Sequence, residues 1–143
     1  MSPKVTDTRV HLLVADQDPA IALAAKMALD DFGYQVRALD SGEATLALVE
    51  KRPPDLILLD VVLPGISGLE VCRRIRESSR HQIPIIVATR LDDSESIEAA
   101  YQAGATACVT KPINWPLLRH QMQYVLRSSR DQARLIESEE RYA

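Results

Sequence analysis

Four short apolar runs in this 143-residue chain each end at a residue that can take part in phosphate chemistry. The end residues are Asp16, Asp60, Thr89 and Lys111, and the runs are 11–15, 56–59, 85–88 and 107–110. Short continuous apolar runs predict strands that are buried on both faces of a parallel sheet. The strands of such a sheet share one carboxyl edge, where ligands bind. We therefore expect the four residues to meet at one site.

These side chains suit a site for a divalent cation and an anionic phosphoryl group. Two carboxylates about 4 Å apart repel each other by about 4 kcal/mol at an effective dielectric constant of 20. A Mg²⁺ ion removes this repulsion and binds carboxylates, waters and phosphate oxygens. A carboxylate can also act as a nucleophile and form an aspartyl phosphate. Asp60 ends the most apolar run, where an isolated charge is costly and needs a cation or hydrogen bonds. Taken singly, Asp16 or Asp60 could be a turn carboxylate and Lys111 a surface residue.

The elements that must position these residues alternate between strands and helices. The apolar pattern predicts strands at 10–15, 34–39, 55–59, 83–88 and 107–110. Helices are expected at 20–32, 41–50, 69–76 and 92–102, with a final helix starting near Asn114. Five such units favour an α/β fold with helices on both faces of the sheet. We expect a flavodoxin-like, doubly wound, five-stranded parallel sheet with five helices, the last of them extended.

Composition excludes several classes of function. The formal net charge of −3 gives no charge footprint for nucleic-acid binding. No apolar stretch approaches the roughly 20 residues of a membrane span, and residues 1–9 lack the apolar core of a signal peptide. We therefore expect a cytoplasmic protein without nucleic-acid or membrane partners. Cys72 and Cys108 lack the number and spacing of a disulfide framework or metal site, and are expected to be small hydrophobic residues.

The end of the chain allows two interpretations. Beyond Arg127 the sequence becomes polar but keeps good helix formers, with no Gly or Pro through Ala143. It is either a frayed, solvated tail or a helix that leaves the domain to pair with another copy or enter a further domain. We predict an N-terminal tail (1–9), one domain (10–127) and a C-terminal helical extension (128–143), with a possible homodimer contact in the extension.

Four segments resemble the receiver domain of two-component response regulators. They are 12–19 (LLVADQDP), 55–68 (DLILLDVVLPGISG), 84–93 (PIIVATRLDD) and 104–114 (GATACVTKPIN). The most specific parts are 60–65 and the pair Lys111-Pro112, and the resemblance extends from about Val10 to Arg127. It implies that Asp60 is the phosphoacceptor, that Lys111 contacts the phosphoryl group and that Thr89 is the switch hydroxyl.

The resemblance also implies a cofactor and partners. Mg²⁺ would be held by Asp16, Asp60 and the backbone carbonyl of Val62. The phosphoryl donor would be a sensor histidine kinase or a phosphotransfer protein, and the only chemistry would be phosphorylation and dephosphorylation of the chain's own aspartate. Segments 113–118 and 137–142 look like those of receivers that lead into PAS, diguanylate cyclase (GGDEF) or EAL domains. We expect an output domain of this type.

Three positions depart from the family pattern. Gln17 stands where a second acid is usual, so Mg²⁺ should bind more weakly; Asp18 could substitute, but Asp18-Pro19 resembles a helix cap. Arg90 follows the switch position, where a small residue is usual, and could cover Asp60, add a cation or point into solvent. Cys108 replaces a common aromatic switch residue. These departures support an alternative: a degenerate receiver that acts as a phosphorylation-independent interaction or dimerisation module.

Overall fold

The computed structural model describes residues 9–78, 82–90 and 94–142, with side chains described as far as Arg130. The strands are β1 (Val10–Ala15), β2 (Tyr34–Leu39), β3 (Leu56–Asp60), β4 (Ile85–Thr89) and β5 (Ala107–Thr110). The helices are α1 (Pro19–Leu29), the short 3₁₀ helix η1 (Asp30–Phe32), α2 (Gly42–Lys51), α3 (Gly68–Glu77), α4 (Ser94–Gln102) and α5 (Trp115–Tyr142).

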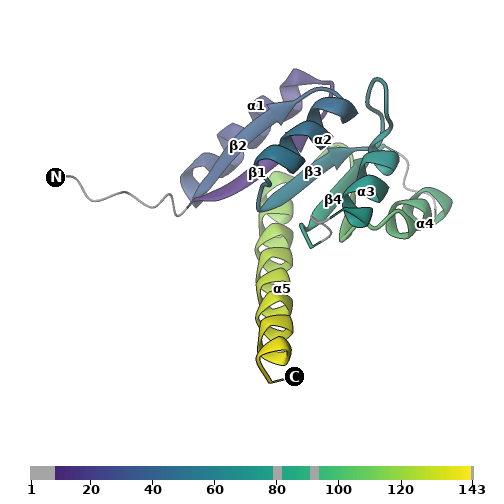
Figure 1. The fold of residues 1–143 in the computed structure, drawn as a ribbon. Helices are drawn as coiled ribbons and strands as arrows, with labels where there is room; N and C mark the ends of the chain where they lie inside the picture. The colour runs from purple at the N-terminus through teal and green to yellow at the C-terminus, as the bar shows by residue number, and fades with distance from the viewer. Residues whose placement is uncertain (1–8, 79–81, 91–93, 143) are drawn as a thin grey trace.

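All five strands lie parallel in one sheet, in the order β2-β1-β3-β4-β5 (Figure 1). The chain passes from β1 to β2 on one side and then to β3 on the other side of β1. The strand order therefore reverses between β1 and β3, and ligands of doubly wound sheets bind at this switch point, beyond the carboxyl ends of the strands. The predicted α/β fold is confirmed, and β2 lies at one edge of the sheet.

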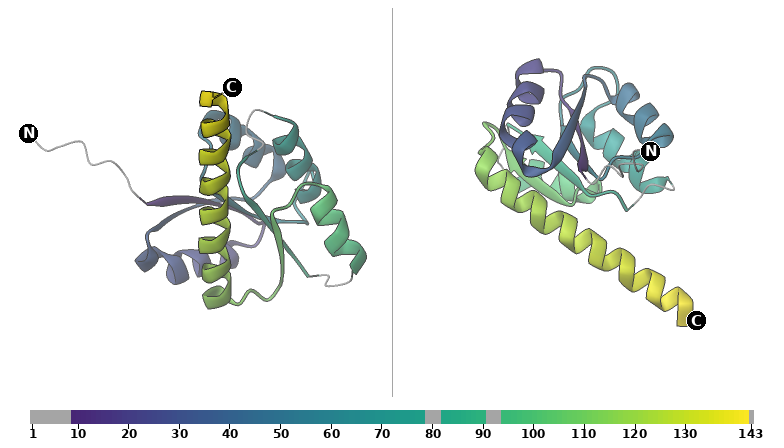
Figure 2. Two further views of the ribbon diagram at one scale, coloured as in Figure 1. Left: turned by 90° about the horizontal axis from the view of Figure 1, so that it is seen from below. Right: turned by 90° about the vertical axis from the view of Figure 1, so that its left-hand side faces the viewer.

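Helices cover both faces of the sheet (Figures 1 and 2). On one face, Ile57 and Leu59 pack in a core with residues of α2, α3 and α4. On the other face, Leu56 and Leu58 pack against α1 and α5. Every residue of β3 is buried. This double burial explains why the central strands have continuous apolar runs and no alternating pattern.

Local capping residues, among them Ser67 at the start of α3, set the starts of four helices. Asp18 caps α1 by accepting a hydrogen bond from the Ala20 N–H at 3.0 Å, and Pro19 follows it as predicted. Ser41 caps α2, and the Asn114 side chain accepts from the Leu117 N–H at the start of α5. The helix predicted at 20–32 ends at Leu29 and continues as η1, whereas the start predicted at Asp92 lies outside the described residues.

The last helix extends beyond the body of the domain. Leu118, Met122, Val125 and Leu126 are buried against the sheet. The remainder of α5 continues as helix to Tyr142 and projects away from the other elements (Figures 1 and 2). The side chains beyond Arg130 and residues 1–8 of the predicted tail lie outside the described part of the chain. No helix within the described residues is long and apolar enough to cross a membrane.

Candidate functional site

Asp16 and Asp60 follow or end the neighbouring strands β1 and β3, and a single lysine bridges them. The Nζ atom of Lys111 lies 2.6 Å from Asp16 Oδ2 and 3.1 Å from Asp60 Oδ2. Each aspartate is only 8% exposed. The structure thus brings together three of the four run-ending residues through direct contacts, at the point where the strand order reverses.

Backbone N–H groups hold the second oxygen of each carboxylate. Asp16 Oδ1 accepts a hydrogen bond from the Asp18 N–H at 2.9 Å, and Asp60 Oδ1 accepts one from the Val62 N–H at 3.2 Å. In each aspartate, one oxygen therefore accepts a hydrogen bond from the backbone two residues later, and the other accepts one from Lys111. Two bonds per carboxylate fix its orientation and offset the cost of burying it.

The backbone of Lys111 is positioned by β4. Its N–H donates to the Thr89 carbonyl at 2.8 Å, one residue beyond the pairing of Thr89 with Thr110. Thr89 ends β4 and is 5% exposed. The fourth run-ending residue thus lies at the same sheet edge and supports the lysine backbone. The Lys111-Pro112 peptide bond is cis.

The three charges at this edge influence one another. Burial raises the pKa of the Asp60 carboxyl above its ordinary value, and the Asp16 charge adds to this, whereas the Val62 N–H and Lys111 act in the opposite direction. Burial lowers the pKa of Lys111, but its hydrogen bonds to Asp16 and Asp60 outweigh burial and raise that pKa. Lys111 is therefore a charged ammonium at neutral pH, and it neutralises one of two acids.

Other predicted positions lie at the rim. Gln17 and Arg90 are exposed, and Asp18 is engaged as the helix cap. Among the described residues, Val62 and Lys111 donate hydrogen bonds to the Asp60 side chain, and the exposed Arg90 does not. The Val62 side chain is 64% exposed. Cys72 is buried in α3, and Cys108 is half-buried on β5 opposite Val87.

Sequence reasoning missed Gly68 as a residue that shapes the site. Its N–H donates to the Val61 carbonyl at 2.9 Å, which closes the loop that follows Asp60. A Cβ atom at this position would collide with the backbone carbonyl oxygen of Asp60. Glycine is therefore required by close approach of two backbone segments. The sequence signal, a glycine shortly before a helix, is too common to reveal this.

Comparison with known protein families identifies the family of this chain. Residues 12–123 match the family model of the response regulator receiver domain. The chain belongs to this family. Receiver domains are the phosphorylated signalling domains of two-component response regulators and generally bind Mg²⁺ at the phosphorylation site; they do not form an enzyme family. The predicted family and function class are thereby confirmed.

Individual receiver-containing relatives support this assignment. The transcriptional regulatory protein AfsQ1 of Streptomyces coelicolor is 41% identical over 116 residues, which cover 81% of this chain and 51% of AfsQ1. The DNA-binding response regulator MtrA of Mycolicibacterium smegmatis is 32% identical, with 87% and 54% covered. This receiver chain thus spans about half the length of these curated relatives. The CheY-like receiver domain protein of Methanospirillum hungatei matches with a TM-score of 0.81 and 26% identity, covering 87% of this chain and 99% of that one.

These relatives correct one prediction about partners. The sequence suggested an output domain of PAS, GGDEF or EAL type and no link to nucleic acid. Both expectations are wrong, because the matched relatives are named as transcriptional and DNA-binding regulators. The net charge of −3 reflects the receiver segment alone and carries no information about a separate domain. Segments 113–118 and 137–142, on which the expected output type rested, lie around the start and near the end of α5.

Proposed function

We propose that Asp60 is the phosphoacceptor of this receiver domain. Asp16, Asp60 and the backbone carbonyl of Val62 would hold Mg²⁺, and Lys111 would bind the phosphoryl group. The observation that carries the proposal is the bridge from Lys111 Nζ to both buried carboxylates. Because of this bridge, a positive charge already lies between two carboxylates at the switch point of the sheet and stabilises both.

In the transfer step, one carboxylate oxygen of Asp60 would be the nucleophile and a phosphohistidine would be the donor. A carboxylate oxygen attacks the phosphorus atom, a P–O bond forms, and the P–N bond to the donor imidazole breaks. The electron pair of that bond leaves with the imidazole, which takes a proton from solvent. Lys111 transfers its hydrogen bond from the carboxylate to a phosphoryl oxygen, and the charge-assisted contact holds the product.

The residues present fit a Mg²⁺ ion. Two buried carboxylates and a backbone carbonyl are hard oxygen donors of the kind this ion prefers. Within the described residues, no cluster of three or more His, Cys, Asp or Glu side chains could hold a metal. Waters and phosphoryl oxygens would therefore complete the coordination shell, as is usual for Mg²⁺. The bound ion would neutralise the phosphoryl oxygens. Gln17 offers at most a neutral oxygen, so we propose weak affinity.

Thr89 and the domain boundaries complete the proposal. The Thr89 hydroxyl would bind the phosphoryl group from the end of β4, because that residue lies at the same edge as Asp60. Cys108 has no ring, so an aromatic switch on β5 is not available. We propose that residues 10–127 form the receiver and that residues 128–143, which include the projecting part of α5, are an extension that carries the signal.

Acetyl phosphate tests the acceptor assignment. The protein is incubated with this donor and MgCl₂, and its intact mass is measured. We expect one adduct with the mass of a single HPO₃ group, which Asp60→Asn abolishes. Asp40→Asn is the matched control, because Asp40 is an exposed acid just after β2 at the same edge, and it should keep the adduct. No adduct on the wild-type protein would instead support the degenerate receiver.

For the whole protein, we propose that the output is control of transcription. The support is the naming of AfsQ1 and MtrA as a transcriptional and a DNA-binding regulator. The test is transcript profiling of a strain whose chromosomal copy carries Asp60→Asn. A defined set of genes should change in expression, whereas an unchanged profile under conditions that phosphorylate the wild-type protein would contradict the proposal.

A further inference from the structure

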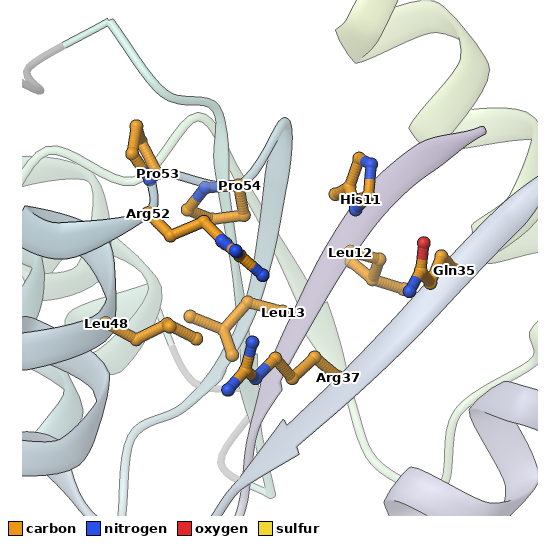
Figure 3. Close-up of a pocket in the computed structure, with 9 residues that line it drawn as sticks. All are labelled: His11, Leu12, Leu13, Gln35, Arg37, Leu48, Arg52, Pro53 and Pro54. Atoms are coloured by element: carbon orange, nitrogen blue, oxygen red, sulfur yellow. The ribbon is translucent and has the colours of Figure 1, made fainter. Parts of the chain in front are cut away.

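A concave site lies toward the amino ends of the strands, away from Asp60. It is a pocket of about 340 Å³ between the start of β1, the edge strand β2 and the segment that connects α2 to β3 (Figure 3). Leu13, Leu48, Pro53 and Pro54 form its apolar lining. The volume is within the range of small-molecule sites, which are mostly apolar with a few polar groups.

Two guanidinium groups reach into this pocket from different elements. Arg37 extends from β2 and Arg52 from the end of α2, and both approach the space above Leu13 (Figure 3). None of the described residues that line the pocket is Asp or Glu. Among the interactions of the described residues, neither guanidinium has an ion pair or hydrogen bond. Two like charges therefore converge on one largely apolar pocket, and within the described residues neither is paired with an acid. The Asp55 carboxylate accepts a hydrogen bond from the His11 backbone N–H at 2.8 Å at the margin of the pocket.

An anion in this position would be attracted to both arginines. It would reduce their mutual repulsion, and its oxygens match the planar, bidentate geometry of guanidinium groups. The leucine and proline surface beside them would remove an apolar group from water. A simple inorganic anion would use only the first of these contributions, and a neutral hydrophobic molecule only the second.

We propose that this pocket binds a small organic anion: a carboxylate, sulfonate or phosphate group attached to an apolar ring or chain. The acidic group contacts Arg37 and Arg52, and the apolar part lies against Leu13 and Leu48. The site is separate from the phosphoacceptor, because β1 begins at the pocket and ends beside Asp16. Ligand binding in this pocket therefore does not require that Asp60 accepts phosphate.

The probe for the test is 8-anilinonaphthalene-1-sulfonate, compared with N-phenyl-1-naphthylamine, which has the same rings without the sulfonate. Binding is measured by fluorescence and mapped by amide chemical shifts in NMR spectra of the full chain. We expect saturation at one site, the largest shifts at residues that line the pocket, and affinity for the neutral probe at least about tenfold lower. Equal affinities or shifts centred elsewhere would overturn the proposal.

Charge-removing variants test the role of the arginines. Arg37→Gln and Arg52→Gln should each weaken sulfonate binding several-fold. Arg73→Gln, which removes an equal charge from the exposed surface of α3, should not. Both pocket residues are exposed, so the fold should persist; dispersed NMR spectra and an unchanged acetyl phosphate adduct confirm this. Equal affinity in all three variants would refute the site even if Asp60 accepts phosphate.

Discussion

The reactivity of the candidate site depends on how strongly its surroundings favour or disfavour the ionised form of the Asp60 carboxyl. Burial and the Asp16 charge disfavour ionised Asp60, whereas the Val62 N–H and the Lys111 ammonium favour it. Burial prevails, so the pKa of Asp60 lies above its ordinary value. A bound cation, or a covalent bond that removes the charge, would therefore stabilise this carboxylate. The same balance predicts how stability depends on pH.

Asp60→Asn should stabilise the metal-free protein at neutral pH. Because the folded-state pKa is raised, the folded protein binds the proton more tightly than the unfolded chain does. Below the ordinary value of 3.8, Asp60 is protonated in both states and contributes no difference. As pH rises through the raised pKa, ionisation destabilises the folded state. The melting-temperature gain of Asp60→Asn, measured in EDTA, should therefore be larger at pH 7 than near pH 4. A gain that grows on acidification would contradict this prediction.

Gln17→Asp should tighten Mg²⁺ binding roughly tenfold, because affinity at oxygen sites increases with ligand charge. Gln17 directly follows Asp16 and is exposed, so the substitution adds charge at the rim with little structural cost. Calorimetric titration with MgCl₂ measures the affinity. Gln35→Asp on β2 is the control for the added charge itself, and it should leave the affinity unchanged. Equal affinities in the two variants would show that charge at position 17 does not limit binding.

At the scale of elements, the segment between β3 and α3 controls the surroundings of Asp60. Val61 donates its N–H to Ala88 on β4, Val62 donates to the Asp60 carboxylate, and Gly68 closes the segment onto Val61. Ser67 then caps α3. Asp60 is thus held between a strand that fixes its backbone and a loop that returns over it.

Gly68→Ala should lower both stability and phosphorylation. The added Cβ would meet the Asp60 carbonyl oxygen, so backbone must shift, at a cost of about 1–3 kcal/mol for overpacking. Denaturant unfolding measures the stability, and the rate of adduct formation with acetyl phosphate measures the chemistry. Gly33→Ala is the control. Gly33 has a φ of 85° and open space around it, so alanine there should cost about 1 kcal/mol without changing the rate. A similar rate loss in both variants would show that the effect is not local to Asp60.

For the whole molecule, the hydrophobic cores on the two faces of the sheet indicate which residues the domain requires in order to fold. Among the α5 side chains that the structure describes, as far as Arg130, the last buried one is Leu126, and the helix beyond it projects from the body (Figure 2). This part of the helix should contribute little to folding, because stability comes mainly from packing of an apolar face.

Deletion of residues 128–143 should change the unfolding free energy by no more than about 1 kcal/mol and leave the adduct on Asp60 intact. Denaturant unfolding and intact mass measure the two quantities. Deletion from Met122 onward is the comparison, and it should unfold the domain because it removes three buried side chains: Met122, Val125 and Leu126. Loss of several kcal/mol on the shorter deletion would place the domain boundary further along α5.

The sequence by itself determined the fold class and the edge of the sheet at which the candidate site lies. Strands buried on both faces are continuous apolar runs, so β1, β3 and β4 could be recognised from composition alone. Parallel strands share a carboxyl edge, which was enough to group Asp16, Asp60, Thr89 and Lys111. Caps such as Asp18 and Ser41 act over a few residues, so they could be predicted too.

Only the tertiary structure decided how these groups meet. The bridge from Lys111 to both aspartates joins residues 95 and 51 positions apart, and its geometry depends on strand order and register. The collision that requires glycine at 68 and the convergence of Arg37 with Arg52 likewise arise from separate elements. Local patterns report on neighbours within a few residues. Contacts between distant segments are set by packing of the whole domain, so residue types could suggest this site but not its distances.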